Sequence, residues 1–377
     1  MLFSSILILA LAFFSLIALM VVHEFGHFIV AKKFGVRVDE FGIGYPPRLF
    51  GKKIGETIYS INLLPLGAFV KIYGEEGGVD DYRSFANLKI WQRVLIVIGG
   101  VVAFWIAAII IFSVVFAMGA DIPVGDQDMS GVSKTEVKVV SVTQDSPAGS
   151  AGIKIADTIK SVEVDGLVLQ INKIEDFQKA SEEYKGREVN VLIERDGGEL
   201  SVILTPRISP PVGQGPAGIG LQRMATLIEK YPWYTAPWHG IAYTWQTTVE
   251  GIKGFYLIFS NLITGKGAPE GASFLGPLGI TVFLANAASY GTGFFLYFIG
   301  IVSVFVAIFN LFPIPALDGG KLIFLIIEKI KGKPVSPKIE QNITVVFFLI
   351  LIIFSIFVTI RFDIPRFIDF IKASLSS

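Results

Sequence analysis

The chain has no cysteine and only three histidines among its 377 residues. The absence of cysteine excludes disulfides and thiolate metal sites, so a metal ion must be held by His, Asp or Glu. The 32 basic residues equal the 32 acidic residues, so the formal net charge is zero and no nucleic-acid partner is indicated. Only 17% of the chain is charged, whereas 52% is hydrophobic and the mean hydropathy is +0.63. This composition is typical of a polytopic membrane protein with a soluble portion.

Four segments are apolar and long enough to cross about 30 Å of hydrocarbon, which takes roughly 20 helical residues. We expect these transmembrane helices at 3–30, 94–120, 294–312 and 343–360. The first segment is not expected to be a cleaved signal peptide, because it lacks a basic start, its apolar run is too long and no small-residue cleavage site follows. The predicted fold class is therefore a polytopic α-helical membrane protein with about four transmembrane helices.

The distribution of basic residues predicts the orientation of these helices. Lysine and arginine are concentrated in the segments 32–93 and 321–338, next to the predicted helix ends. By the positive-inside rule both segments face the cytoplasm. The long segment 121–293 and the C-terminus are then expected on the other side of the membrane.

A charged motif, His23-Glu24-Phe25-Gly26-His27, follows directly after a charge-free apolar run in the first predicted helix. Residues four apart share one face of a helix, so His23 and His27 can bind the same Zn²⁺. Glu24 is placed to act as general base toward a water molecule at that metal. Ionisable groups at membrane depth are costly and point to function. The motif therefore predicts a catalytic zinc site of the metallopeptidase type within a membrane helix.

A catalytic zinc site needs a third protein ligand and keeps one position open. The segment 310–320, at the end of the third predicted helix, reads NLFPIPALDGG. Its prolines break the helix and aim Asp318, the one acidic residue there, inward, so we expect Asp318 to be the third ligand. Asn310 is the one amide of this segment and is predicted to hydrogen-bond the scissile peptide or to stabilise an oxyanion.

Other assignments stay open at this point. Asp318 alone would also suit the N-cap of a following helix. A second alternative is a membrane zinc protease with its active site in a cytosolic domain, for which Glu75, Glu76 and Glu328 are the acidic candidates for the third ligand. We expect His239, which lies in an aromatic-rich stretch, to be an interfacial or structural histidine and not a ligand.

Two β-prone runs in the segment 56–74 flank Pro65-Leu66-Gly67, which predicts a β-hairpin with its turn at these residues. The hairpin is apolar for a cytoplasmic loop. It either packs on its own loop domain or dips towards the membrane beside the metal, where protein or water must cover its backbone. In the second case a substrate strand can pair with its edge.

The segment 134–206 has the pattern of a compact α/β domain with a helix at 174–184. Its order of elements resembles a circularly permuted PDZ domain of the kind found in bacterial proteases, which binds peptide ends by strand addition. A structural spacer with a closed groove is the alternative.

The strands of this α/β domain are predicted at 137–142, from 157, at 188–195 and at 199–206, with turns at 164–166 and 196–198. A linker at 207–240 and an amphipathic helix at 240–263, expected on the outer membrane surface, follow.

Over nearly its whole length the chain resembles the site-2 protease family of intramembrane zinc metalloproteases, and most closely its bacterial regulator-of-sigma-E protease branch. In that family HExxH in the first span pairs with NxxPxxxxDG in the third, and both motifs are matched here. The resemblance implies that His23, His27 and Asp318 bind Zn²⁺, that Glu24 is the catalytic base and that Asn310 contacts substrate. It also implies a membrane-associated, substrate-binding β-hairpin at Pro65, Leu66, Gly67, Ala68, Phe69 and Val70.

The same resemblance implies partners and a location. Substrates would be single-span membrane proteins, such as anti-sigma factors or remnant signal peptides, trimmed beforehand by a site-1-type protease. The enzyme would be a multi-pass protein in the bilayer of the bacterial inner membrane, with its active site towards the cytoplasm and its PDZ-like domain outside. The single PDZ-like domain departs from the best-known members, which have two in tandem. The alternative function is a non-proteolytic membrane scaffold that uses the PDZ-like module, in which Glu24 would be dispensable.

The expected organisation is a series of nine segments: first transmembrane helix with HExxH, 1–32; cytoplasmic loop with β-hairpin, 33–92; second helix, 93–120; PDZ-like domain, 130–207; linker and interfacial helix, 208–293; third helix with the Asn and Asp motif, 294–318; cytoplasmic loop, 319–341; fourth helix, 342–361; and C-terminal tail, 362–377.

Overall fold

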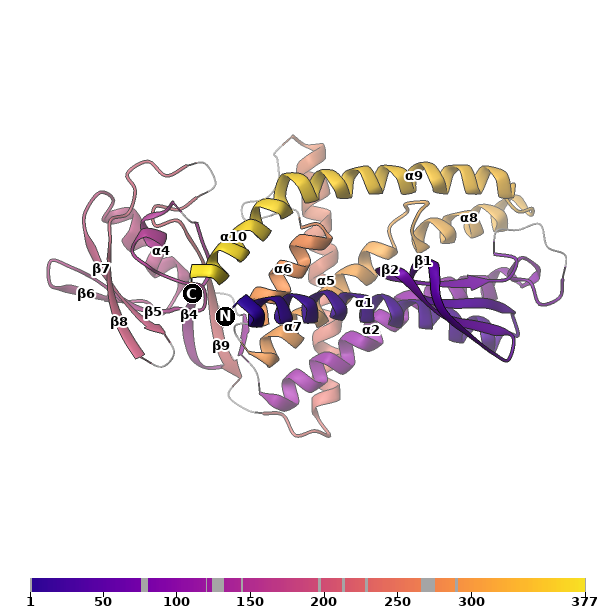
Figure 1. Cartoon of the computed structure of the whole chain (residues 1–377), viewed down its shortest axis with the longest axis horizontal. Helices are drawn as coiled ribbons and strands as arrows, with labels where there is room; N and C mark the ends of the chain where they lie inside the picture. The colour runs from indigo at the N-terminus through magenta and orange to yellow at the C-terminus, as the bar shows by residue number, and fades with distance from the viewer. Residues whose placement is uncertain are drawn as a thin grey trace. The chain divides into compact units, whose positions relative to one another are not determined.

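The computed structural model describes residues 2–75, 81–119, 121–123, 132–143, 145–195, 198–211, 214–227, 230–265, 275–288 and 291–376 (Figure 1). The chain forms two compact units. The helical unit comprises Met1–Val114, Tyr234–Ala288 and Phe295–Ser377. The sheet unit comprises Val115–Trp233 and Ser289–Phe294.

Four helices are long and apolar enough to cross a membrane, by their length and composition: α1 (Leu2–Lys33), α2 (Ile90–Met118), α7 (Thr292–Asn310) and α9 (Pro337–Val358). The apolar stretch of α9 continues through a π-helical turn, η2 (Thr359–Asp363), into α10 (Ile364–Ser376). These helices confirm the four predicted apolar helices, with bounds that differ from the predicted ones by a few residues.

Helices α1 and α2 approach each other closely at two glycines. A Cβ atom on Gly26 would lie 2.2 Å from the carbonyl oxygen of Gly99, and a Cβ atom on Gly99 would lie 2.8 Å from the carbonyl oxygen of Gly26. Small residues allow this backbone approach between membrane helices. Gly26 lies inside the HExxH motif, so the contact fixes the motif directly against α2.

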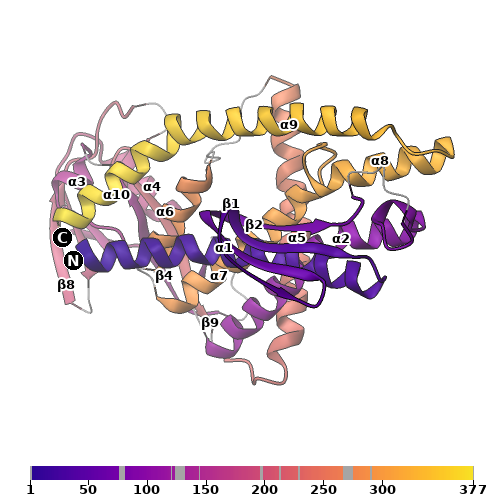
Figure 2. The same cartoon turned by 45° about the vertical axis from the view of Figure 1, so that its right-hand side comes forward.

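A two-stranded sheet of β1 (Val38–Ile54) and β2 (Thr57–Ile72) lies beside the C-terminal part of α1 (Figures 1 and 2). The residues 40–43 of β1 have two neighbours, 58–61 and 68–71, both within β2. The two β-prone runs therefore flank β1 and do not pair with each other. The predicted β-hairpin is present as β1 and β2, but the predicted turn at residues 65–67 is wrong, because the chain reverses at Gly55 and Glu56 and β2 then folds around β1.

Beneath this sheet lies a core shared by α1, α2 and the sheet. It contains Ala31, Val38, Ile72, Phe85 and Ile96, which are all buried. A short 3₁₀ helix, η1 (Phe85–Asn87), precedes α2 and supplies Phe85. The sheet also connects to α1 by charge, since Glu56 pairs with both Lys32 and Arg83, and these hydrogen bonds hold the pKa of Glu56 below its ordinary value.

Three more helices complete the helical unit: α5 (Ala236–Ile263), α6 (Pro277–Ala288) and α8 (Asp318–Lys331). The buried face of α5 is built from small residues, and a Cβ atom on Gly240 would meet Ser113 of α2 while one on Gly251 would meet Ile308 of α7. Its exposed face is apolar and aromatic: Trp238, Ile241, Trp245, Ile252 and Tyr256. A helix is thus present at the predicted place, and its interfacial position at a membrane surface stays a prediction.

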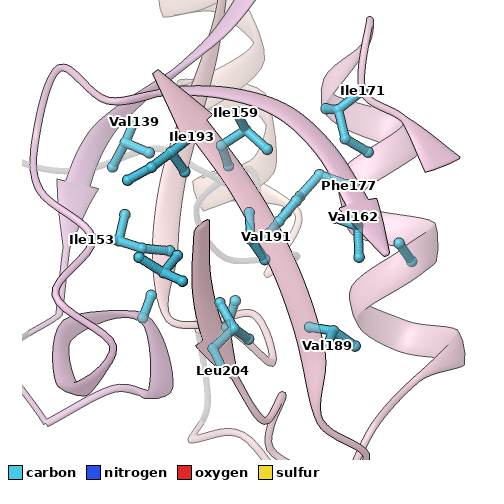
Figure 3. Close-up of a cluster of buried hydrophobic side chains, with 14 of the residues drawn as sticks. Val139, Ile153, Ile159, Val162, Ile171, Phe177, Val189, Val191, Ile193 and Leu204 are labelled. Atoms are coloured by element: carbon cyan, nitrogen blue, oxygen red, sulfur yellow. The ribbon is translucent and has the colours of Figure 1, made fainter. Parts of the chain in front are cut away.

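The sheet unit contains a seven-stranded antiparallel sheet with the order β3-β9-β4-β5-β7-β8, and β6 pairs with β5. Side chains from several strands and from α4 fill its core (Figure 3). The elements are β3 (Asp121–Pro123), β4 (Val132–Val142), α3 (Pro147–Ser150), β5 (Thr158–Val164), β6 (Leu167–Gln170), α4 (Ile174–Glu183), β7 (Val189–Arg195), β8 (Gly198–Leu204) and β9 (Ile219–Leu227).

The predicted strands and helix of this unit are found close to their expected positions, but the predicted boundaries of the unit are too narrow. Strand β9 lies within the segment 208–293 that is predicted as linker and interfacial helix, and it pairs with both β3 and β4. Strand β3 precedes the predicted start at residue 130. Two residues of the predicted turn at 196–198, Asp196 and Gly197, lie outside the described residues.

The contact at Gly26 gives a test of the packing of α1 against α2. Gly26→Ala should lower the free energy of unfolding of the metal-free protein by about 1–3 kcal/mol, because the added methyl group forces two backbones apart. Gly254→Ala on α5 is the matched control, since nothing lies within 4 Å of the position that a Cβ atom would take there. The measurement is the thermal midpoint in detergent, and equal midpoints for both variants would contradict the close approach.

Candidate metal centre and active site

Three ligand atoms converge between α1 and the start of α8. The Nε2 atoms of His23 and His27 are 3.1 Å apart, and each lies 3.4 Å from Oδ2 of Asp318. All three residues are buried. They are the one group of three or more His, Asp or Glu residues with metal-binding spacing in the described part of the chain. The structure therefore brings together the predicted ligands, although Asp318 comes 291 residues after His27 in the sequence.

The spacing of these atoms fits a zinc ion. Ligand bonds of about 2.0–2.1 Å in a tetrahedral site separate the ligand atoms by roughly 3.3–3.4 Å. In addition, Oδ2 of Asp318 is buried and has no hydrogen-bond partner among the described residues. A buried carboxylate oxygen without a partner is costly, and a cation at this point would satisfy it. Two imidazoles and one carboxylate leave the fourth tetrahedral position for water or substrate.

Helix α2 supplies no ligand but orients both histidines. The Nδ1–H group of His27 donates to the carbonyl oxygen of Ile96 at 2.9 Å, which leaves its Nε2 lone pair free for a metal. The ring of His23 stacks on Phe104, with centroids 4.6 Å apart. Gly100 lies between these two contacts, and a Cβ atom there would come within 2.4 Å of Nε2 of His27. Position 100 therefore requires glycine.

Asp318 is the first residue of α8 and not its N-cap. The N-cap is Leu317, and its side chain makes no capping bond, so the N-cap assignment of Asp318 is wrong. The carboxylate is directed at the histidines, and it lies near the positive end of the α8 dipole. The two following glycines allow the helix to start tightly against the preceding loop, because Cβ atoms on Gly319 and Gly320 would lie 2.2 Å and 2.3 Å from the carbonyl oxygens of Phe312 and Ile314.

Glu24 lies on α1 between the two histidines and is half-buried. It interacts electrostatically with His27, Asp318 and Lys321. No side chain among the described residues forms a hydrogen bond or ion pair with its carboxylate. A carboxylate that is next to the ligands but is not itself committed to them has the position expected of a general base.

Asn310 ends α7 and is half-buried, eight residues before Asp318. Its amide donates to the carbonyl oxygen of Val306 at 3.0 Å, within its own helix. The structure therefore does not bring this donor into the ligand group, and contact with substrate stays a prediction. Contact with substrate also stays a prediction for the six residues of β2 from Pro65 to Val70. Of these residues, Leu66 is 67% exposed and Ala68 is buried.

The remaining candidates for the third ligand are occupied elsewhere. Glu75 pairs with Lys321, and Glu328 pairs with Arg93. Glu76 lies outside the described residues. His239 is on α5, outside the ligand group found among the described residues, and its interfacial or structural role stays a prediction.

Ile96, Gly100 and Phe104 were missed by the sequence analysis, although each contacts a ligand histidine. Two of them act through a main-chain carbonyl or the absence of a side chain, and neither leaves a chemical signature in sequence. The helical spacing of 96, 100 and 104 gives one signal, because it places the three residues on one face of α2.

A His₂Asp site that begins in an apolar helix, with a free carboxylate beside it, defines a membrane metallopeptidase. Comparison with known families agrees with this class, since the model of Peptidase family M50 matches residues 11–354. The chain belongs to peptidase family M50, the site-2 protease family, and its cofactor is zinc.

Individual relatives are similar along nearly the whole chain. A Clostridium perfringens protein named as a zinc metalloprotease is 34% identical over 357 residues, which cover 94% of this chain and 97% of the relative. A Clostridium acetobutylicum protein of similar name is 33% identical over 362 residues, covering 95% and 97%. Regulator of sigma-E protease RseP of Escherichia coli is 29% identical over 415 residues, covering 86% and 91%. The similarity therefore includes the sheet unit as well as the helices.

Gly100 provides a test of the site that leaves every ligand in place. Gly100→Ala should weaken zinc binding at least about tenfold, because its methyl group would overlap the imidazoles of His23 and His27. Zinc affinity is measured by competition with a chromophoric chelator. Wild-type affinity in a folded Gly100→Ala protein would mean that the two histidines do not hold the metal while packed against Gly100.

Proposed function

We propose that this metalloprotease hydrolyses a peptide bond within the transmembrane segment of single-span membrane proteins. The observation that carries this proposal is the position of the ligands. His23 and His27 lie within α1, which is apolar enough to cross a membrane, and Asp318 follows shortly after the end of α7. A substrate that reaches these residues must itself be at membrane depth.

The chain's own residues account for the steps around the metal. Zinc, when bound by His23, His27 and Asp318, supplies Lewis-acid polarisation of the scissile carbonyl. Glu24 takes the proton from the attacking water and passes it to the leaving amine. The hydrogen bond from His27 to the carbonyl oxygen of Ile96 keeps the imidazole in the tautomer whose Nε2 lone pair can bind the zinc ion.

The sheet of β1 and β2 is proposed to present the substrate as an extended strand. A helix hides its carbonyls in its own hydrogen bonds, so a substrate helix must unwind before hydrolysis. Among the described residues, 68–71 pair on one side only, with 40–43 of β1. We propose that a substrate strand pairs with the other edge of this part of β2. Pro65, Leu66, Gly67, Ala68, Phe69 and Val70 would contribute to this edge.

The orientation follows from the distribution of charge. Lys32 and Lys33 end α1, and Lys329 and Lys331 end α8, so the positive-inside rule places these ends in the cytoplasm. We propose a bacterial inner-membrane location, with the metal site towards the cytoplasmic side and the sheet unit on the opposite side of the membrane.

The sheet unit is proposed to be a PDZ-like module that favours substrates already shortened outside the membrane by a site-1-type protease. Its antiparallel sheet with one helix, α4, between β6 and β7 supports this interpretation. Anti-sigma factors and remnant signal peptides have the required single span. The alternative is a membrane scaffold that uses the same module without proteolysis.

The deciding experiment follows a labelled single-span model substrate with a short ectodomain, incubated in detergent with wild-type protein or Glu24→Gln. We expect a chelator-sensitive cut within the membrane segment by the wild type, and a loss of at least about 100-fold in rate for Glu24→Gln. Glu250→Gln on α5 is the matched control, because Glu250 is exposed and bonds only Gln246 among the described residues. Equal cleavage by wild type and Glu24→Gln would rule out Glu24 as base, and absence of cleavage by the wild type would favour the scaffold.

A further inference from the structure

Helix α8 determines where the third ligand lies. Asp318 is its first residue, whereas His23 and His27 are on α1 and are held by α2. Metal ligands must be placed within a few tenths of an ångström, so α8 needs attachments that fix both its distance and its register along α2. Two ion pairs on one face of α8 provide such attachments.

The first ion pair joins Arg93, in the first turn of α2, to Glu328 in α8. Nη1 of Arg93 donates to Oε2 of Glu328 at 2.9 Å, and Nη2 pairs with Oε1, so the contact is bidentate. The side chains are only 10% and 14% exposed. A bidentate guanidinium–carboxylate pair fixes direction as well as distance, and burial protects it from screening by salt.

The second ion pair has the opposite polarity. Lys321 of α8 pairs with Glu75, which follows β2. Lys321 and Glu328 are seven residues apart, which is about 10.5 Å and two turns on the same face. Leu325 lies between them, is buried, and packs in the same core as Ile96 and Val97 of α2. Near its start α8 offers the cation Lys321, and near its end it offers the anion Glu328. A shift of α8 by one helical turn along its axis would therefore separate each of these residues from its partner.

One face of helix α2 therefore contacts His23, His27 and helix α8, which carries Asp318. Arg93 holds α8, the carbonyl of Ile96 holds His27, Gly100 admits both imidazoles, and Phe104 stacks on His23. The positions 93, 96, 100 and 104 follow the helical repeat. A displacement of α8 relative to Arg93 is thus a displacement of Asp318 relative to the histidines.

We propose that Arg93 and Glu328 are positioning residues that set the zinc affinity by fixing the register of α8. Neither residue belongs to the ligand group of His23, His27 and Asp318. The pair acts through the helix, because Glu328 is ten residues from Asp318 on the same rigid element. This inference rests on the metal site of the proposed function, but it does not depend on proteolysis.

The test measures zinc affinity by chelator competition and the visible spectrum of the Co²⁺-substituted protein, for the full chain in detergent. Glu328→Gln and Arg93→Lys should weaken zinc binding by about 10–100-fold and reduce the tetrahedral Co²⁺ absorption. Arg93→Lys keeps the charge but loses the bidentate geometry, so it separates position from charge. The exchange Arg93→Glu with Glu328→Arg should bind zinc more tightly than either reversal alone.

Glu340→Gln is the matched control. Glu340 lies within electrostatic reach of Arg93 and Lys321 but makes no ion pair in the part of the chain that the structure describes, so the zinc affinity of this variant should stay at the wild-type value. A merely structural pair would lower the thermal midpoint of the metal-free protein and leave the zinc affinity and the Co²⁺ spectrum unchanged. The proposal would be overturned if Glu328→Gln and Arg93→Lys gave that result. It would also be overturned if the protein with both Arg93→Glu and Glu328→Arg bound zinc no more tightly than the protein with either change alone.

Folding and the proposed function are separated within the same experiment. Gel filtration and circular dichroism identify any variant that does not fold, and Arg93→Lys, as the mildest change, then decides the outcome. If the wild-type protein itself bound no zinc, the metal centre of the proposed function would fail. If the wild type bound zinc and all positioning variants bound it equally well, the positioning role alone would fail.

Discussion

The helical unit depends on holding His23 Nε2, His27 Nε2 and Asp318 Oδ2 within 3.4 Å of one another in a buried site. Without a cation this arrangement places a buried carboxylate oxygen against nitrogen lone pairs, which is unfavourable. His23, His27 and Asp318 would hold a zinc ion in this geometry, and its binding would offset that cost, so metal binding and local folding would be coupled. The protein scaffold must supply the remaining free energy that keeps the two helix ends together.

Helix α2 is the common support for that geometry although it contributes no ligand. At Gly99 its backbone meets α1 directly, at Ile96 it fixes the tautomer of His27, and at Arg93 it binds α8. The three contacts differ in kind. Gly99 allows close approach because it has no side chain, Ile96 acts through its main-chain carbonyl, and Arg93 acts through its guanidinium group. Rigid support of this kind favours catalysis because the ligands need no rearrangement when the substrate arrives.

The sequence alone is sufficient to predict the four apolar helices and the ligand set, because hydropathy and the HExxH spacing report local chemistry. It fails where non-local pairing decides. The runs on either side of Pro65-Leu66-Gly67 look like a hairpin, yet both pair with β1, which comes earlier in the chain. Strand β9 escapes prediction because its polar and glycine content hides a strand that is completed only by β3 and β4. The supports on α2 escape prediction because a carbonyl and a glycine carry no residue-type signal.

The most direct test of the account is X-ray absorption at the zinc edge of the purified, zinc-loaded protein. The account predicts four nitrogen and oxygen ligands at about 2.0–2.1 Å, with the outer-shell scattering of two imidazoles. In Asp318→Asn the imidazole signal should persist while the first shell changes. A spectrum with one imidazole or none, or a first shell that is identical in the wild type and Asp318→Asn, would contradict the claim that His23, His27 and Asp318 together bind the metal.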